Sequence, residues 1–379
     1  MCKGQPMPQP MFCLGGYELN RYHTYPHSNG FTVDGRQMIV MQMMPDHTSL
    51  WLLTTELLDT SPQSISPGRR IASFDLPQPV RDKKPIPIWP DIALNKNILT
   101  VSVQDSIWLL NLDDIGSKPQ LIYVAPQGWQ LADLTSLKPD ASAVCFGVYD
   151  QTNSISRCME IDLQTLQPRM LLEDDTRLIN HFHYSPYDPD WIGFAHEGPA
   201  TEIPDRVNGY HPTLAPNGRC LFDQQSAEPG KLLAVGHERW CYDQPTAIAV
   251  AYGASPAGPR GIYRIFADAS ESAQLISQAD RDWHCNVSRD GKHMVVDTSG
   301  PSDQPGCGWD EAGNVSDVVY LDPATGQRTL LSRTKLATHP WHPHPTFSPD
   351  GRWVFFNDFN GDTNNPRGRV GCVCVDALS

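Results

Sequence analysis

Three histidines lie within six residues near the C-terminal end of the chain, in the stretch THPWHPHPTFSPDG from Thr338 to Gly351. The prolines between them exclude a helix and favour extended backbone, so His342 and His344, two residues apart, point to the same side. Imidazole is the commonest metal ligand, and His339 is near enough to join the pair. The stretch therefore predicts a metal site, although a surface loop that happens to be rich in histidine is the alternative.

The turn that ends this stretch is one copy of a pattern that recurs along the chain: an apolar run, an Asp-Gly-like turn and an alternating strand. The markers of its copies are Asp34, Asn95, Asp140, Asp188, Asp243, Asp290 and Asp350. Six intervals between the first and last marker average about 53 residues, close to the period of β-propeller blades. Seven copies predict an all-β fold, a seven-bladed β-propeller. A β-sandwich beside an unrelated domain is the alternative, but it does not explain a repeat sustained over most of the chain.

The repeat predicts a single domain over residues 1–379, with two irregular parts. One is an N-terminal extension of about residues 1–22, which precedes the first copy. The other is an insertion at about residues 207–233, where an extra Pro-Asn-Gly turn fits no blade.

Histidines fall at nearly equal distances before four of the turns. In a propeller the innermost strands surround a central channel, so residues at equal distances before the turns form a ring at one mouth. The histidines at this position are His183, five residues before its marker, and His237, His284 and His344, six residues before theirs. The first three repeats have Ser28, Trp89 and Leu134 there. Side chains in register on adjacent blades converge, so the sequence predicts that these imidazoles meet.

The predicted metal ligands are His284, His342 and His344, with His339 beside them. Three or four nitrogens suit a divalent first-row transition ion. His237, in VGHERWCYD, is a neighbour of this set. A neutral imidazole next to a cation has a lowered pKa and can act as a general base. The structural alternative is that His237 only packs against Trp240.

The composition favours β structure and narrows the class of partner. Hydrophobic residues make up 40% of the chain and charged residues only 19%, whereas proline and glycine number 34 and 28. The net charge of -14 argues against nucleic acid or an anionic membrane as partner, but not against a small anionic substrate. The sequence has no apolar signal region or spanning segment and no CxxC pair among its ten cysteines. We therefore expect a cytoplasmic protein with buried thiols.

Four segments together resemble the oligogalacturonate lyases, a family of seven-bladed propeller polysaccharide lyases. The segments are GFAHEGP (193–199), GHERW (236–240), WHCNVSRDGKHMVVD (283–297) and HPHPTFSPDGRWVFFNDFNG (342–361). The first 150 residues match only as generic blades. The tandem His-Pro-His-Pro before a strand is the most specific element.

The resemblance implies a manganese site formed by His284, His342 and His344. The family's fourth ligand is a glutamine at the position of His339, so this chain exchanges an oxygen donor for nitrogen. The resemblance also implies that His237 is the catalytic base.

The resemblance further implies that Arg206, ten residues after the histidine of HEGPATEIPDR, assists catalysis. His181, at the start of the same repeat's inner strand, and His196, which opens the HEGP motif, are expected to bind substrate.

The chemistry implied by the resemblance is β-elimination on an acidic oligosaccharide, most simply oligogalacturonate, to give a 4,5-unsaturated uronate. The C5 proton is weakly acidic while the adjacent carboxylate is charged, so a divalent cation and Arg206 are needed to neutralise that carboxylate. A glycoside hydrolase would need two opposed carboxylic acids, and G-x-S-x-G does not occur in the sequence. The alternatives are a lyase for another uronate oligosaccharide, such as a glucuronate-linked one, and a non-catalytic, translocation-type propeller that binds protein or peptide.

Overall fold

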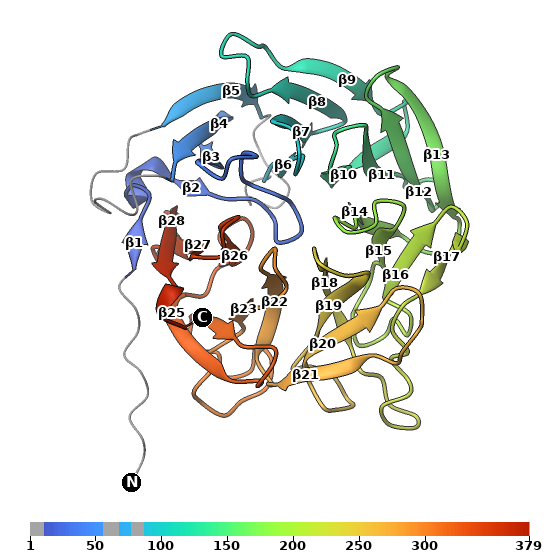
Figure 1. Ribbon diagram of the computed structural model, residues 1–379, viewed down its shortest axis with the longest axis vertical. Helices are drawn as coiled ribbons and strands as arrows, with labels where there is room; N and C mark the ends of the chain where they lie inside the picture. The colour runs from blue at the N-terminus through green and yellow to red at the C-terminus, as the bar shows by residue number, and fades with distance from the viewer. Residues whose placement is uncertain (1–10, 56–67, 77–86, 379) are drawn as a thin grey trace.

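The computed structural model describes residues 11–55, 68–76 and 87–378. Within these residues the strands form seven antiparallel sheets of four strands each, arranged around a central axis (Figure 1). The predicted all-β, seven-bladed propeller is confirmed.

Each blade contributes one inner strand to the axis and three further strands that lead outward. Blades 1 and 2 consist of β2 (Arg21–Tyr22), β3 (Gln37–Met43), β4 (His47–Thr54) and β5 (Arg69–Asp75), then β6 (Pro90–Ile92), β7 (Ile98–Val103), β8 (Ser106–Asn111) and β9 (Gln120–Val124). Blades 3 and 4 consist of β10 (Trp129–Leu137), β11 (Ala143–Asp150), β12 (Ile155–Asp162) and β13 (Gln167–Asp174), then β14 (Ile179–Tyr184), β15 (Ile192–His196), β16 (Val207–His211) and β17 (Ala215–Cys220). Blades 5 and 6 consist of β18 (Val235–Trp240), β19 (Thr246–Ala251), β20 (Gly261–Phe266) and β21 (Gln274–Gln278), then β22 (Asp282–Val287), β23 (Met294–Thr298), β24 (Val315–Leu321) and β25 (Arg328–Lys335). Blade 7 consists of β26 (Thr346–Phe347), β27 (Trp353–Phe359), β28 (Gly368–Cys374) and β1 (Phe12–Cys13).

The repeated turn between the first two strands of a blade is held by its own side chains. In blade 7 the hydroxyl of Ser348 donates to the carboxylate of Asp350 at 2.5 Å, and the backbone N–H of Gly351 donates to the Ser348 carbonyl at 2.9 Å. Gly351 has φ 76°, a left-handed conformation that glycine adopts at little cost. The same hydroxyl-to-carboxylate bond joins Thr32 to Asp34 (2.7 Å) and Ser288 to Asp290 (2.6 Å). These turns fix where each inner strand ends, and so the height of the residues before it.

Both irregular parts expected from the sequence turn out to include blade strands. In the N-terminal part, Phe12 and Cys13 pair with Cys372 and Gly371 of β28 and close the ring, while Arg21–Tyr22 is the inner strand of blade 1. Residues 1–10 of the expected extension lie outside the described residues. In the second part, residues 207–220 contain β16 and β17, the outer strands of blade 4, because the Pro-Asn-Gly turn lies within a paired strand. A connection to blade 5 follows them.

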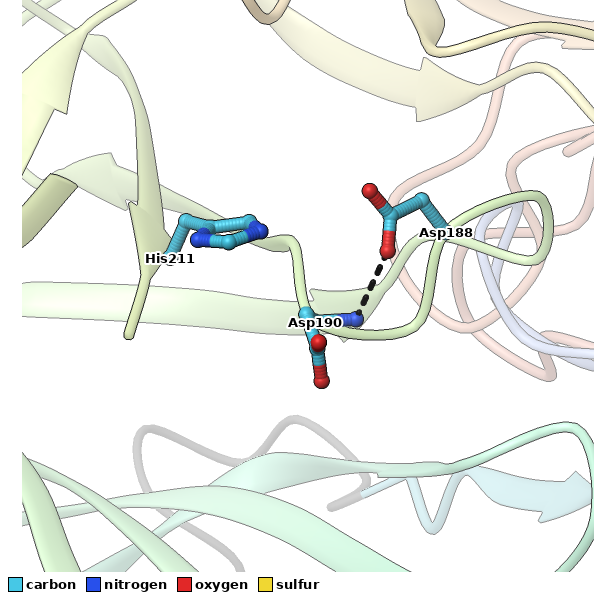
Figure 2. Close-up of side chains that lie close together, drawn as sticks. All are labelled: Asp188, Asp190 and His211. Atoms are coloured by element: carbon cyan, nitrogen blue, oxygen red, sulfur yellow. Dashed lines mark hydrogen bonds between the residues drawn. The ribbon is translucent and has the colours of Figure 1, made fainter. Parts of the chain in front are cut away.

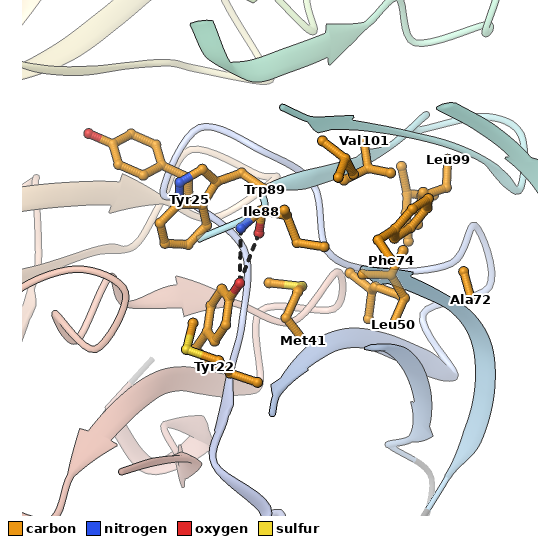
Figure 3. Close-up of a cluster of buried hydrophobic side chains, with 14 of the residues drawn as sticks. Tyr22, Tyr25, Met41, Leu50, Ala72, Phe74, Ile88, Trp89, Leu99 and Val101 are labelled. Atoms are coloured by element: carbon orange, nitrogen blue, oxygen red, sulfur yellow. Dashed lines mark hydrogen bonds between the residues drawn. The ribbon is translucent and has the colours of Figure 1, made fainter. Parts of the chain in front are cut away.

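Apolar side chains from neighbouring blades pack between the sheets. Between blades 1 and 2, Tyr22 and Trp89 are buried in a cluster that also contains Met41, Leu50 and Phe74 (Figure 3). The hydroxyl of Tyr22 donates to the carbonyl of Ile88 at 3.3 Å and accepts the N–H of the same residue at 3.0 Å. This pair of bonds fixes the start of blade 2 against β2, the inner strand of blade 1.

The nine described cysteines are free thiols, and five of them are buried. No helix in the described ranges has the length and apolar character needed to cross a membrane.

Candidate active site

The inner strands of blades 4 and 5 each contain a β-bulge at the channel mouth. The pairing register shifts between Asn180 and His183 in β14, and between Gly236 and Arg239 in β18. Within the bulges His181 has φ 59° and His237 has φ 50°, values that non-glycine residues adopt rarely and mostly where the surroundings enforce them. The bulges bring these two histidines to the same pocket.

The bulges correct the predicted ring of histidines. Counting back from the turn places His183 in the ring, but an extra residue in the strand puts His181 beside the pocket instead. His183 stacks on His27, with ring centroids 4.4 Å apart and planes 3° apart.

The other predicted histidines converge around His284. Its ring centroid lies 4.1 Å from that of His237, 4.4 Å from His344, 5.3 Å from His342 and 6.3 Å from His339. Two imidazoles on one ion, each with a metal–nitrogen bond of about 2.1 Å, have centroids roughly 4.5 to 6.5 Å apart. The ring spacing is thus in the range for a shared ion, although no three of the ring nitrogens in the described residues lie within 4.8 Å of one another.

Asp297, on β23, orients this set. One of its carboxylate oxygens accepts the backbone N–H of His284 at 2.8 Å, and the other accepts that of His344 at 3.0 Å. The carboxylate also lies 2.9 Å from Nδ1 of His284, which places the ring proton on Nδ1 and leaves Nε2 with its lone pair. A carboxylate behind a histidine in this way is the usual outer partner of a metal ligand.

Three ring nitrogens of this set have no hydrogen-bond partner among the described residues: Nε2 of His284 and both nitrogens of His344. Both side chains are fully buried. Buried polar atoms are nearly always paired, so these nitrogens point to a missing ligand.

The four imidazoles are held in the neutral form, which is the form that binds metal. Burial, together with His339, lowers the pKa of His342 to about 3. His339 is more exposed, and enclosure of its ring together with His284 lowers its pKa as well. Burial and neighbouring histidines lower the pKa values of His284 and His344 well below the usual range. The donor set thus fits a divalent first-row ion.

A second group of potential ligands lies in blade 4 (Figure 2), and none of its members lines the pocket that contains His181 and His237. One ligand atom each from Asp188, Asp190 and His211 lie within 4.8 Å of one another. However, Nδ1 of His211 accepts the backbone N–H groups of Thr213 and Leu214, both at 3.1 Å. Its lone pair is therefore used, and Nε2 carries the proton in the neutral ring, so this histidine has no free nitrogen for a metal.

A pocket of about 330 Å³, including its opening to solvent, lies beside the histidine set. Its lining includes Tyr25, His181, Arg206, His237, Glu238 and His284. His284 is thus shared between the pocket and the predicted metal ligands.

Arg206 is anchored at the pocket by its two terminal nitrogens. Nη1 donates to the carbonyl of Gly198 at 2.7 Å, and Nη2 lies 3.3 Å from the carboxylate of Glu197. Its buried Nε has no partner within the described parts of the chain. The arginine is fixed in place with one donor still free for a ligand.

Two carboxyl side chains have opposite environments: Glu238 lines the pocket, whereas Glu197 lies behind the lining residues His181 and Arg206. Nε2 of His181 lies 3.0 Å from Glu197. Burial raises the pKa of Glu197, but His181 and Arg206 lower it by more, to about 2. Glu238 is 6% exposed, and burial raises its pKa. Glu197 is therefore a fixed negative charge, whereas Glu238 is held toward its neutral form.

His237 has the arrangement of a base. Its Nδ1 donates to the carbonyl of Trp283, so the lone pair is on Nε2. Burial and then His284 lower its pKa well below the usual range, which keeps it neutral. Its ring contacts in the described structure are with Tyr252, Trp283 and His284, so packing against Trp240 does not explain its position.

His196, the other residue expected to bind substrate, does not line the pocket. Its ring lies among Arg177, Asp174 and Asp205, with Nδ1 3.1 Å from Arg177 and 3.3 Å from Asp205. Its side chain contributes to a charged cluster beside the pocket, and its backbone carbonyl accepts from Arg206 at 3.4 Å.

The sequence analysis missed the contribution of blade 1. The segment after β2 reaches the channel, where Arg239 donates to the carbonyl of His27 at 2.7 Å and Asn286 donates to that of Pro26 at 2.8 Å. The ring of Tyr25 lies 5.2 Å from His344, and Figure 3 shows its hydroxyl pointing away from the apolar cluster. The alternation of His23, Tyr25 and His27 beside a proline is the signal that could have identified this segment.

The comparisons with known proteins agree with this geometry. No family model matches the chain. It is 25% identical over 221 residues to the oligogalacturonate lyase of Dickeya dadantii, and 26% identical over 219 residues to the oligogalacturonide lyase of Pectobacterium atrosepticum. The resemblance to the oligogalacturonate lyase family is confirmed. Each match covers 55% of this chain and 54% of the relative, so the chain spans about half the length of the curated relatives it matches.

Two solved structures of oligogalacturonate lyases match over nearly the whole chain. One is an oligogalacturonate lyase in complex with manganese, with a TM-score of 0.74, 17% identity, and coverage of 98% of this chain and 94% of the other. The second is the oligogalacturonate lyase from Vibrio parahaemolyticus, with a TM-score of 0.75, 17% identity, and coverage of 99% and 96%. At this identity the likeness shows the shared fold.

Proposed function

We propose that this chain is a metal-dependent lyase that cleaves oligogalacturonate by β-elimination, giving a 4,5-unsaturated uronate. The observation that carries the proposal is the meeting of His284, with its unpartnered ring nitrogen, and His237 at one pocket that also contains Arg206. The sequence likeness to oligogalacturonate lyases supports the substrate class.

In this proposal His284, His339, His342 and His344 hold a divalent metal. Manganese is the first choice, because a propeller of the same fold is an oligogalacturonate lyase in complex with manganese. When bound, such an ion supplies positive charge that stabilises the enediolate formed at the uronate carboxylate. The described histidines do not bring three nitrogens within 4.8 Å of one another, so their rings would have to turn about their side-chain bonds to hold one ion.

The chain's own residues bind the uronate carboxylate and remove the proton. Arg206 offers its free Nε to the uronate carboxylate, while Glu197 holds the other end of its guanidinium. His237 takes the C5 proton at Nε2, a step that contributes about 10² to 10⁴-fold to the rate. His181 fixes Glu197, and so acts on substrate through Arg206.

Substrate choice and location are parts of the same proposal. A glucuronate-linked oligosaccharide remains the alternative substrate, and a translocation-type propeller that binds protein or peptide remains the non-catalytic alternative. The acidic chain and its free thiols are consistent with a cytoplasmic enzyme for an acidic oligosaccharide, without nucleic acid or membrane as partner.

A panel of uronate oligosaccharides, incubated with the protein with and without a chelator and analysed by mass spectrometry, tests this function. We expect unsaturated products from oligogalacturonate, their loss with chelator and their return with Mn²⁺. Saturated products would indicate hydrolysis, and unchanged activity in chelator would contradict the metal dependence. Cleavage of glucuronate-linked chains alone would select the alternative substrate, and no cleavage of any member would favour the binding protein.

A further inference from the structure

We propose that Glu238 is the general acid of this site, which protonates the glycosidic oxygen as it leaves C4. The inference rests on the proposed β-elimination and adds the residue that completes it. His237 accounts for the proton that is removed, but the alkoxide that leaves also needs a proton.

The bulge in β18 places Glu238 where this role requires it. Consecutive residues of a regular strand point to opposite faces, yet His237 and Glu238 both line the same pocket. The register shift between Gly236 and Arg239 and the positive φ of His237 account for this departure. Base and acid thus come from neighbouring positions in one strand.

The side chain of Glu238 is prepared for a partner that the described residues do not supply. It is 6% exposed, and its buried Oε1 has no hydrogen-bond partner in the described structure. An unpaired buried carboxyl oxygen costs free energy unless a ligand satisfies it. In its neutral form the carboxyl has an O–H that can donate to a glycosidic oxygen.

Burial favours the neutral form of Glu238, although the charged groups around it act in both directions. Burial raises its pKa and the negative charge of Glu197 adds to this, while His181 and Arg206 oppose it. The phenol of Tyr25, which lines the same pocket, is uncharged because burial raises its pKa. Two carboxyls whose environments drive their pKa values apart are a common sign of different roles, here Glu197 as fixed charge and Glu238 as proton donor.

The step balances without another reactant. Nε2 of His237 takes the C5 proton, and the electron pair of that C–H bond forms the C4=C5 double bond. The C4–O bond breaks, and its electron pair takes the proton of the Glu238 carboxyl, so that the departing sugar leaves as an alcohol. The imidazolium of His237 then returns a proton to the carboxylate of Glu238, directly or through water, and both groups are reset.

Leaving-group dependence in Glu238→Gln tests the assignment. The substrates are digalacturonate, whose leaving alkoxide needs a proton, and a galacturonate with a 4-nitrophenyl ether at O4, whose phenolate leaves without one. We expect the variant to cleave digalacturonate about 10² to 10⁴-fold more slowly than the wild type and the aryl ether less than about tenfold more slowly. Equal losses on both substrates, or no loss on digalacturonate, would overturn the role of Glu238. Failure of the wild type on both substrates would instead contradict the proposed function itself.

Two further variants make the comparison specific. Glu173→Gln makes the same substitution on an exposed outer strand and should match the wild type on both substrates. Tyr25→Phe removes a second neutral proton donor that lines the pocket, and we expect equal losses on both substrates; a loss confined to digalacturonate would assign the acid to Tyr25. Manganese content and thermal unfolding of Glu238→Gln should equal those of the wild type.

Discussion

Two groups of potential metal ligands in this propeller differ in an instructive way. In the group of blade 4, Asp188, Asp190 and His211 lie close together, but the histidine nitrogen that could bind an ion accepts backbone N–H groups instead. At the channel mouth the histidines are less tightly grouped, yet His284 and His344 have buried nitrogens without partners in the described residues. The difference in free lone pairs is why we propose the metal at the channel mouth and not in blade 4, where the groups lie closer together.

The largest expected effect is at the channel mouth. His344→Ala removes a fully buried ligand, and we expect manganese affinity to fall by more than about 100-fold, beyond the range for an outer partner, with loss of turnover. Metal content after dialysis against limiting Mn²⁺ and the rate of oligogalacturonate cleavage measure this. Because the substitution also leaves a cavity, thermal unfolding of metal-free variant and wild type must be compared. Full metal content in the folded variant would remove His344 from the ligand set.

A smaller effect is expected behind the ligands. Asp297→Asn keeps one oxygen as an acceptor, but it replaces the other with an NH₂ group that cannot accept, so the backbone N–H of His284 or of His344 and the ring Nδ1 of His284 lose part of their support. Manganese affinity should fall by about 10 to 100-fold, as is usual for an outer-shell partner. Calorimetric titration with Mn²⁺ measures this affinity. An unchanged affinity would show that Asp297 only accepts backbone N–H groups and does not orient the metal ligands.

His339→Gln tests the ligand position at which the family resemblance implies a glutamine. The substitution introduces an oxygen donor in place of nitrogen, so turnover should change by less than the factor of ten that corresponds to about 1.4 kcal/mol. Rates measured with Mn²⁺ and with Zn²⁺ show whether the nitrogen donor shifts the choice of metal. Collapse of activity with both ions would show that His339 is not the fourth ligand.

The smallest effect on metal and turnover is expected in blade 4. His211→Ala should leave both unchanged, which also makes it a matched control for His344→Ala. It removes the acceptor for the N–H groups of Thr213 and Leu214 and the contact with Trp191 at 4.9 Å, so unfolding free energy should fall by about 1 to 3 kcal/mol. Urea unfolding measures the loss, and a fall in manganese content would contradict the comparison.

The fold was predictable because its repeat is carried by local chemistry. A Ser or Thr hydroxyl on a turn aspartate, followed by a left-handed glycine, is visible in the sequence as SPDG or SRDG. The closing strand Phe12–Cys13 was not predictable, because two residues carry no pattern and their partner β28 lies at the other end of the chain.

The candidate site was predictable only in part. The meeting of His284 and His344 follows from their register, and that of His342 from its position two residues before His344. The position of His181 at the pocket, in place of His183, does not follow from the register, because a β-bulge shifts the strand by one residue without a mark in the sequence. The role of Asp297 was not predictable, because it lies in an apolar strand and its partner His284 lies 13 positions earlier in the chain.

The most direct test of the account compares the wild type with His237→Ala at equal manganese content. Absorbance at the band of unsaturated uronate is followed after addition of oligogalacturonate. We predict a steady rise with the wild type and a rate at least about 10²-fold lower with the variant, because the base is lost while the metal ligands remain. Equal rates in the two proteins, or cleavage without the unsaturated product, would contradict β-elimination at the histidine-lined mouth of this propeller.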